Sequence, residues 1–149
     1  MLKADLLSSI TSNPYPTTMK NKILHADDDV IFSGIVKKIL HQQGFEVYSA
    51  FDGEQAWQLF NEVAFDSCLL DIMMPRLSGI DLGERIRNRD KGIPIYYLSG
   101  EDHERVSADV FGRGGANGYF SKTFNLRELT GKLQASLTEY NNYIQRKNK

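Results

Sequence analysis

The sequence contains a single cysteine among its 149 residues, so no disulfide can form within the chain. The lack of a disulfide framework fits a reducing compartment, and Cys68 lies in an apolar run where we expect a buried, unreactive thiol. Long apolar stretches are also missing, and the N-terminus lacks the compact apolar core of a signal peptide. We therefore expect a cytoplasmic protein without a membrane partner.

An excess of charge of either sign is absent as well. The chain has 18 Lys and Arg residues against 19 Asp and Glu residues, and its formal net charge is −1 at pH 7. No overall field therefore favours nucleic acid as a direct partner. Hydrophobic residues make up 41% of the chain and charged residues 25%, which together with the length indicates one globular domain.

Two regions differ in composition. Residues 1–19 are rich in Ser, Thr, Asn and Pro, so we predict a flexible N-terminal tail. From residue 20 to residue 149, strand-like runs alternate with helical periods. The strand-like runs are Ile23–Ala26, Phe45–Ala50, Phe65–Leu70, Ile93–Leu98 and Gly118–Phe120. The glycines that stand where three of the helices should end are Gly44, Gly92 and Gly114-Gly115.

This alternation predicts an α/β fold with a five-stranded parallel sheet and helices on both faces. Because the first and third strands carry acids, they should flank the switch point of a flavodoxin-like (αβ)5 sandwich with strand order 2-1-3-4-5. The last helix should begin after Asn125, a suitable N-cap with Glu128 three residues on. It should run on past Leu137, because one apolar stripe continues along it: Leu133, Leu137, Tyr140 and Ile144. This extension has three interpretations: a longer cap, a partner surface or the stub of a linker to a further domain.

Three carboxylates follow two of the expected strands. Asp27 and Asp28 come directly after the first strand, and Asp71 ends the third. Open α/β sheets place their chemistry at the carboxyl ends of the strands. Three acids at neighbouring strand ends make a site for a hard cation, in which one carboxylate can act as a nucleophile. Asp29 should point away and help to start the first helix.

Four segments, each closing a strand, resemble the receiver domain of bacterial two-component response regulators, the chemotaxis-regulator type of phosphoacceptor. They are Ile23–Asp29, Leu69–Pro75, Pro94–Gly100 and Gly115–Lys122. Each segment alone is a weak signal, but the four in this order are highly specific. The resemblance extends from about Lys20 to Leu137.

This resemblance implies that Asp71 accepts a phosphoryl group from a sensor histidine kinase or a histidine phosphotransfer protein, as in a phosphorelay. The reaction would require Mg2+, bound directly by Asp28, Asp71 and the backbone carbonyl of Met73, with Asp27 acting through water. Such a protein is a signalling phosphoacceptor rather than an enzyme with its own substrate, although it assists its own phosphorylation and dephosphorylation.

The resemblance also implies a switch. Lys122 would reach Asp71 and later a phosphoryl oxygen, the Ser99 hydroxyl would donate to the phosphoryl group, and the Tyr119 ring would move inward with it. Phosphorylation adds about two negative charges. These charges would change the conformation of the face around the fourth helix, marked by Val106, Val110 and Phe111, and the fifth strand. In its new conformation this face would bind an unknown downstream protein or form a phosphorylation-dependent homodimer.

Several departures and alternatives remain. The family usually has a proline joined by a cis bond after the lysine, but Thr123 follows Lys122, so we expect a trans bond. We favour a stand-alone receiver that acts through protein contacts. The main alternative is a receiver fragment of a longer DNA-binding regulator or hybrid kinase. A small phosphatase-type enzyme is disfavoured because Met73, two residues after Asp71, is not an acid. His25 is expected to be a core histidine with satisfied hydrogen bonds.

Overall fold

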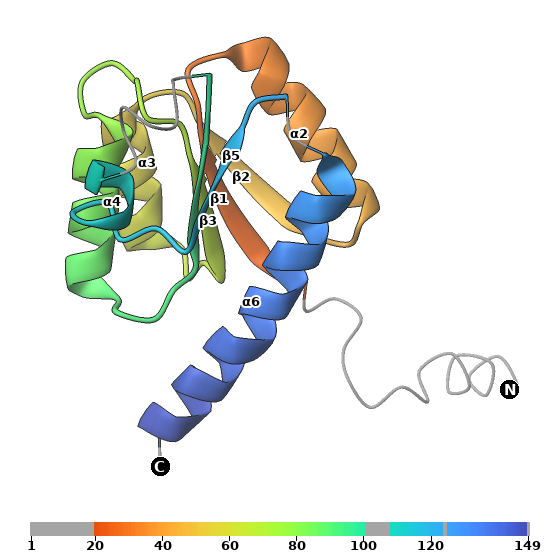
Figure 1. Cartoon of the computed structure of the whole chain (residues 1–149), viewed down its shortest axis with the longest axis vertical. Helices are drawn as coiled ribbons and strands as arrows, with labels where there is room; N and C mark the ends of the chain where they lie inside the picture. Colours follow the sequence, from red (N-terminus) through yellow and green to blue (C-terminus); the bar gives the residue numbers. More distant parts are fainter. Residues whose placement is uncertain (1–19, 101–107, 124, 149) are drawn as a thin grey trace, which may run out of the picture.

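The computed structural model describes residues 20–100, 108–123 and 125–148. Its centre is a parallel sheet with the strand order β2-β1-β3-β4-β5, as the sequence predicts (Figure 1). The strands are β1 Lys22–Ala26, β2 Glu46–Ala50, β3 Ser67–Leu70, β4 Ile95–Ser99 and β5 Gly118–Ser121. Three of them begin later than the apolar runs, because Phe45, Phe65 and Ile93 are buried ahead of the paired residues.

Helices cover both faces of the sheet. They are α2 Val30–Gln42, α3 Gly53–Glu62, α4 Gly79–Arg89 and α6 Leu126–Lys147, and residues 108–111 are also helical. In Figure 1, α2 and α6 lie on one side of the sheet, and α3 and α4 lie on the other. The start of the fourth predicted helix and the predicted N-terminal tail both fall outside the described residues.

Side chains at the helix starts confirm two predictions. Asp29 is the N-cap of α2 and accepts a hydrogen bond from the Phe32 amide at 3.0 Å, while Asn125 caps α6. Gly44 follows α2 with φ of 94°, in the left-handed region that favours glycine. The prediction for Gly92 is wrong. The α4 helix ends at Arg89, and the Asp90 carboxylate accepts hydrogen bonds from the amides that follow, so the helix does not end at a glycine.

The core has two layers because successive strand residues point to opposite faces. One cluster packs between the sheet and the pair α3 and α4, and it includes Leu24, Leu70, Leu82, Ile86, Ile95 and Cys68. The other lies beneath α2 and α6, and it includes Ile23, Val36, Leu40, Leu69, Leu98 and Leu129. Burial raises the pKa of the Cys68 thiol, as expected for an unreactive core residue.

The second half of α6 is part of the domain. Leu133, Leu137 and Tyr140 are buried, and the Tyr140 hydroxyl donates to an Asp90 carboxylate oxygen at 2.6 Å. The Tyr143 ring packs so closely on Gly92 that a Cβ there would lie 2.3 Å from it. The predicted apolar stripe therefore packs on the domain, with Leu133 and Leu137 in the core layer beneath α6 and Tyr140 and Ile144 in the other layer. No helix in the described ranges has the length and apolar character needed to cross a membrane.

Candidate functional site

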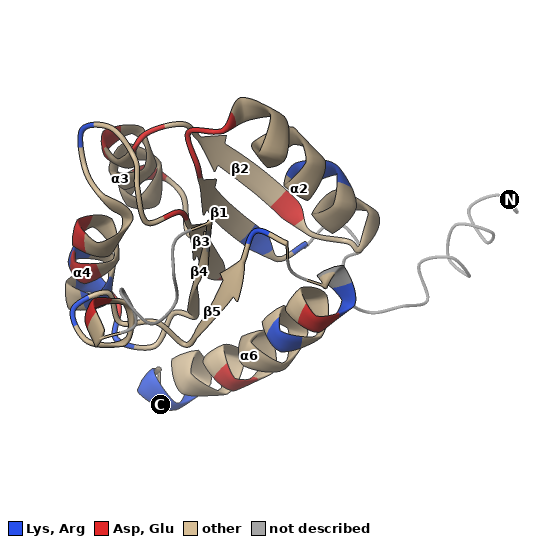
Figure 2. Cartoon of the chain, turned by 45° about the horizontal axis from the view of Figure 1, so that its top comes forward, with Lys and Arg blue, Asp and Glu red and all other residues tan. Residues whose placement is uncertain are grey.

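The parallel register brings the ends of β1 and β3 together. Ala26 pairs with Leu70, and the Asp71 amide donates to the Ala26 carbonyl at 2.8 Å. Asp27 and Asp71 are therefore each one residue past the paired ends of adjacent strands. Figure 2 shows acidic residues where the ends of β1 and β3 lead into the following loops. The sheet edge thus holds two carboxylates that are 44 residues apart in the sequence.

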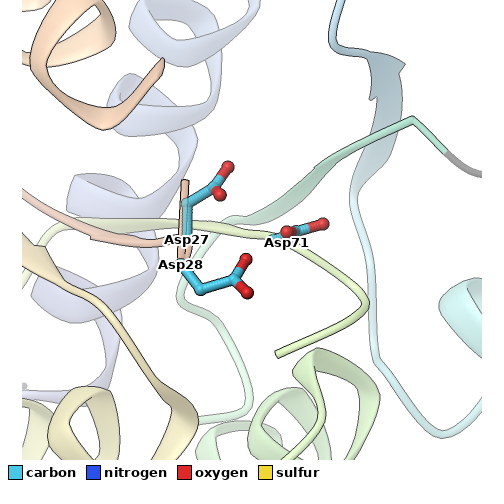
Figure 3. A group of neighbouring side chains, drawn as sticks. All are labelled: Asp27, Asp28 and Asp71. Atoms are coloured by element: carbon cyan, nitrogen blue, oxygen red, sulfur yellow. The ribbon is translucent and has the colours of Figure 1, made fainter. Parts of the chain in front are cut away.

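Asp28 completes a group of three acids. Each of Asp27, Asp28 and Asp71 offers one carboxylate oxygen, and these oxygens all lie within 4.8 Å of one another (Figure 3). Asp27 is fully buried and Asp71 is 5% exposed, whereas Asp28 is exposed. Hard oxygen donors with one side open to water are the ligand set that Mg2+ prefers, since it retains several waters. The three residues therefore fit a small divalent cation.

The crowded acids change the protonation of Asp71. Burial and the neighbouring Asp27 charge raise the pKa of Asp71 to about 6, against the opposing pull of Lys122 and a hydrogen bond from the Ile72 amide. That amide donates to Asp71 Oδ1 at 2.8 Å, whereas Asp71 Oδ2 lies 3.4 Å from Lys122 Nζ. The two oxygens of this carboxylate are consequently not equivalent.

Lys122 contacts Asp27 more closely than it contacts Asp71. Its ammonium lies 3.0 and 3.1 Å from the two Asp27 oxygens. Burial acts to lower the pKa of Lys122, but the hydrogen bond to Asp27 and the charges of Asp71 and Asp27 outweigh it and raise the pKa. Lys122 is therefore a firmly charged ammonium that bridges two acids.

Two residues near the site were not found by sequence reasoning. Lys122 Nζ lies 4.9 Å from the centroid of the Phe32 ring, a cation–π distance that no motif signalled. His25 is fully buried, and neither ring nitrogen has a hydrogen-bond partner within the described part of the chain. The expectation of a satisfied core histidine is therefore wrong. The signal available was the period of two in β1, which places His25 and Asp27 on the same face.

The remaining predicted residues lie on β4 and β5. Ser99 is the last residue of β4 and pairs with Ser121, while its hydroxyl is outside what the structure describes. Tyr119 lies on β5, half-buried, against the core on the α4 side. The Lys122–Thr123 bond is trans, since no peptide bond between described residues is cis, and this prediction is confirmed.

Fold and site together define a doubly wound α/β protein with a group of three acids at its switch point that fits a small cation. The family model of the response regulator receiver domain matches residues 23–134, and the chain belongs to this family. The family and the fold class predicted from the sequence are thereby confirmed.

Individual relatives agree with this assignment. The chain is 37% identical over 120 residues to response regulator GtcR of Aneurinibacillus migulanus, covering 80% of this chain and 48% of that protein. It is 39% identical over 119 residues to transcriptional regulatory protein CpxR of Escherichia coli K12, covering 78% and 49%. The chain thus spans about half the length of these curated relatives.

Solved structures show the same fold. A CheY-like receiver domain protein from Methanospirillum hungatei superposes with a TM-score of 0.78 at 27% identity, covering 83% of this chain and 98% of that one. Response regulator TrrA from Thermotoga maritima, solved in complex with Mg2+ and BeF, gives a TM-score of 0.71 at 31% identity, covering 78% and 98%.

Proposed function

We propose that this receiver domain accepts a phosphoryl group on Asp71, in a reaction that requires Mg2+, from a sensor histidine kinase or a histidine phosphotransfer protein. The observation that carries this proposal is the Asp71 carboxylate itself. It lies nearly buried between two further acids and 3.4 Å from an ammonium. The Mg2+ and BeF complex of TrrA supports the choice of cation.

The geometry supports a separate role for each group in the proposed reaction. The Ile72 amide holds Asp71 Oδ1, so Oδ2 is the oxygen that attacks phosphorus while the phosphorus–nitrogen bond of the phosphohistidine breaks. Phosphoryl transfer needs positioning and charge neutralisation more than a strong nucleophile. Mg2+, when bound by Asp28, Asp71 and the Met73 carbonyl, with Asp27 acting through water, supplies most of that neutralisation. Lys122 supplies the remaining neutralisation, because its ammonium lies 3.4 Å from Asp71 Oδ2.

The proposed switch follows from the new charge. Lys122 and the Ser99 hydroxyl turn towards the phosphoryl oxygens, and the Tyr119 ring moves inward with the hydroxyl. Shifting a two-state element from 1:99 to 99:1 takes about 5.5 kcal/mol. Two charge-assisted hydrogen bonds, each contributing about 1.5–3 kcal/mol, are of that size. The output is then a protein contact or a homodimer on the face formed by β5 and the helix that includes residues 108–111.

The same residues are proposed to assist hydrolysis of the acyl phosphate. The Met73 side chain is 63% exposed and offers neither an acid nor an amide to orient the attacking water. We therefore expect a phosphorylated state that persists for minutes. The proposed compartment is the cytoplasm, in keeping with the free, buried Cys68 thiol.

A second candidate function is the receiver of a longer DNA-binding regulator. It is favoured by one observation, namely that the matched relatives, such as CpxR, are transcriptional regulators about twice as long as the aligned segment. Reading the complete gene would decide between a stand-alone receiver and this alternative.

Phosphorylation is tested by mass spectrometry after incubation with Mg2+ and acetyl phosphate. The wild type should gain one phosphoryl group, and Asp71→Asn should gain none. Asp81→Asn is the matched control, because Asp81 is an acid paired with Arg113 on the exposed side of α4. Equal labelling of the wild type and Asp71→Asn would refute the assignment of Asp71.

The metal site is tested separately through thermal stability. Asp28→Ala should raise the melting temperature in EDTA by roughly 2–4 °C, because it relieves about 1 kcal/mol of repulsion among the acids. It should also remove the further stabilisation that Mg2+ gives the wild type. Glu62→Ala, at the exposed end of α3, removes the same charge and should leave the Mg2+ effect unchanged. A lower melting temperature of Asp28→Ala in EDTA would mean that Asp28 is structural.

A further inference from the structure

The buried imidazole of His25 is the most unusual polar group beside the site. Its side chain has no exposure to solvent, and both of its ring nitrogens lack a hydrogen-bond partner among the described residues. Leaving a buried donor or acceptor without a partner costs about 1–3 kcal/mol. An apolar residue of similar size would avoid that cost at a position on the central strand β1. Packing alone therefore does not explain why this position holds a histidine.

Its surroundings point to Asp27. His25 Nε2 lies 4.0 Å from Asp27 Oδ2, which is beyond hydrogen-bond distance but within reach of a small movement of the carboxylate. The edge of the Phe32 ring lies against the imidazole, with 6.2 Å between the ring centroids. Burial and the nearby Lys122 charge lower the pKa of His25 to about 4, so the ring is neutral at pH 7 and has one N–H to donate.

Lys122 is the group whose movement would matter. In the structure its ammonium neutralises Asp27, at 3.0 and 3.1 Å from the two oxygens. A phosphoryl group on Asp71 would draw the same ammonium away, because Lys122 already lies 3.4 Å from Asp71 Oδ2. Asp27, which is fully buried, would then lose its closest hydrogen-bond donor from a side chain. A buried carboxylate without such a donor is costly.

We propose that His25 is a positioning residue that donates a hydrogen bond from Nε2 to Asp27 Oδ2 when Lys122 turns to the anion on Asp71. The inference rests on the proposed phosphorylation of Asp71. A ring N–H suits this task, because Nε2 lies 4.0 Å from Asp27 Oδ2 and has no other hydrogen-bond partner among the described residues. Phosphorylation would then exchange one partner of Asp27 for another, instead of leaving the Asp29 amide, 2.9 Å from Asp27 Oδ1, as its remaining protein donor among the described residues.

Three variants of the full chain separate this role from packing. His25→Leu keeps the volume but has no donor, and it should lower the rate of phosphorylation by acetyl phosphate about tenfold while raising the melting temperature in EDTA. His25→Gln places an amide N–H close to the position of Nε2 and should restore the rate to within about threefold of the wild type. His25→Asn places its amide nearer the position of Nδ1 and should behave like His25→Leu.

A spectroscopic measurement tests the hydrogen bond itself. In 15N-labelled protein, the Nε2–H signal of His25, identified by its loss in His25→Leu, should shift downfield when Mg2+ and beryllofluoride are added. An unshifted signal, or equal rates in the wild type and His25→Leu, would overturn the role of His25. So would an equal loss in the Leu and Gln variants. If the wild type itself is neither phosphorylated nor responsive to beryllofluoride, the proposed function fails instead.

Discussion

At the scale of the residue, Asp71 shows how position changes the chemistry of a common side chain. Its side chain is 7% exposed and faces Asp27 across the strand ends. The charge of Lys122 partly offsets the effects of burial and of Asp27 on the pKa of Asp71. Its two oxygens have separate partners, the Ile72 amide and the Lys122 ammonium. An acid in such a place is unfavourable when it is ionised and no metal is bound. In the proposed function, the same arrangement would let it bind a cation and attack phosphorus.

This electrostatic cost predicts a dependence of stability on pH in EDTA. The pKa of Asp71 is about 6 in the folded protein and about 3.9 in an unfolded chain. The folded state therefore binds this proton more tightly, and the Asp71 contribution to stability is present below about pH 4 and is lost as the pH rises through about 6. The ionised, metal-free wild type should consequently be less stable than Asp71→Asn at pH 7, by about 1–3 kcal/mol.

Urea unfolding of both proteins between pH 4 and pH 7 measures this difference. The stability gap between Asp71→Asn and the wild type should widen with rising pH and level off above about pH 6. A gap that narrows with rising pH would mean that the ionised form of Asp71 is the favoured one, with Lys122 outweighing burial and Asp27.

At the scale of the element, the start of α4 is seated against the site. The Gly79 amide donates to the Ile72 carbonyl at 2.8 Å, and a Cβ on Gly79 would lie 1.8 Å from the Asp71 carbonyl oxygen. Across the core, the Tyr97 hydroxyl donates to the Gly114 carbonyl at 2.9 Å, with the Gly79 carbonyl at 3.3 Å. The start of α4 therefore contacts the backbone at Asp71 and Ile72, and the Tyr97 hydroxyl links it to the loop before β5.

A substitution at Gly79 should consequently disturb the site through the backbone. Gly79→Ala forces α4 away from Asp71, and we expect a loss of about 1–3 kcal/mol in unfolding free energy together with slower phosphorylation. Gly34→Ala is the matched control, because no atom lies within 4 Å of a Cβ placed at Gly34 in the middle of α2. It should stabilise the protein by about 0.5–1 kcal/mol. Chemical denaturation and acetyl phosphate labelling of both variants measure the two effects.

At the scale of the whole molecule, the sheet is complete between residues 22 and 121, and α6 closes the domain from its side. All three acids lie in this range, and Lys122 directly follows it. The described residues thus include the five strands of the sheet and the candidate site. We therefore propose that the domain begins near residue 20 and that the preceding segment contributes little to stability.

Deleting residues 1–19 tests this division. The shortened chain should have the same unfolding free energy as the full chain within about 0.5 kcal/mol, the range expected for changes away from the core. Its phosphorylation rate should also be unchanged. A large loss of stability would show that residues 1–19 pack on the domain, and a loss of phosphorylation alone would show that they act on the site.

Most of the fold was predictable because its signals are local. Apolar runs, helical periods and the capping residues Asp29 and Asn125 all act within a few positions along the chain, and the structure places strands and helices there. Helix ends were less certain. The α4 helix ends at Arg89, and the Asp90 side chain accepts hydrogen bonds at the helix end where a glycine was expected. The order of the strands also followed from sequence, because right-handed crossovers and acids at two strand ends leave few topologies.

The sequence by itself thus determined the family, the sheet order and the three acids, since these depend on motif order and on periods of two and 3.6. Only the tertiary structure decided how the charges share partners. It placed Lys122 closer to Asp27 than to Asp71, set Phe32 beneath the ammonium and left His25 without a hydrogen bond. Such contacts join residues up to 95 positions apart, as between Asp27 and Lys122. They depend on side-chain packing between β1, β5 and α2. No pattern within a few positions of the sequence predicts such packing.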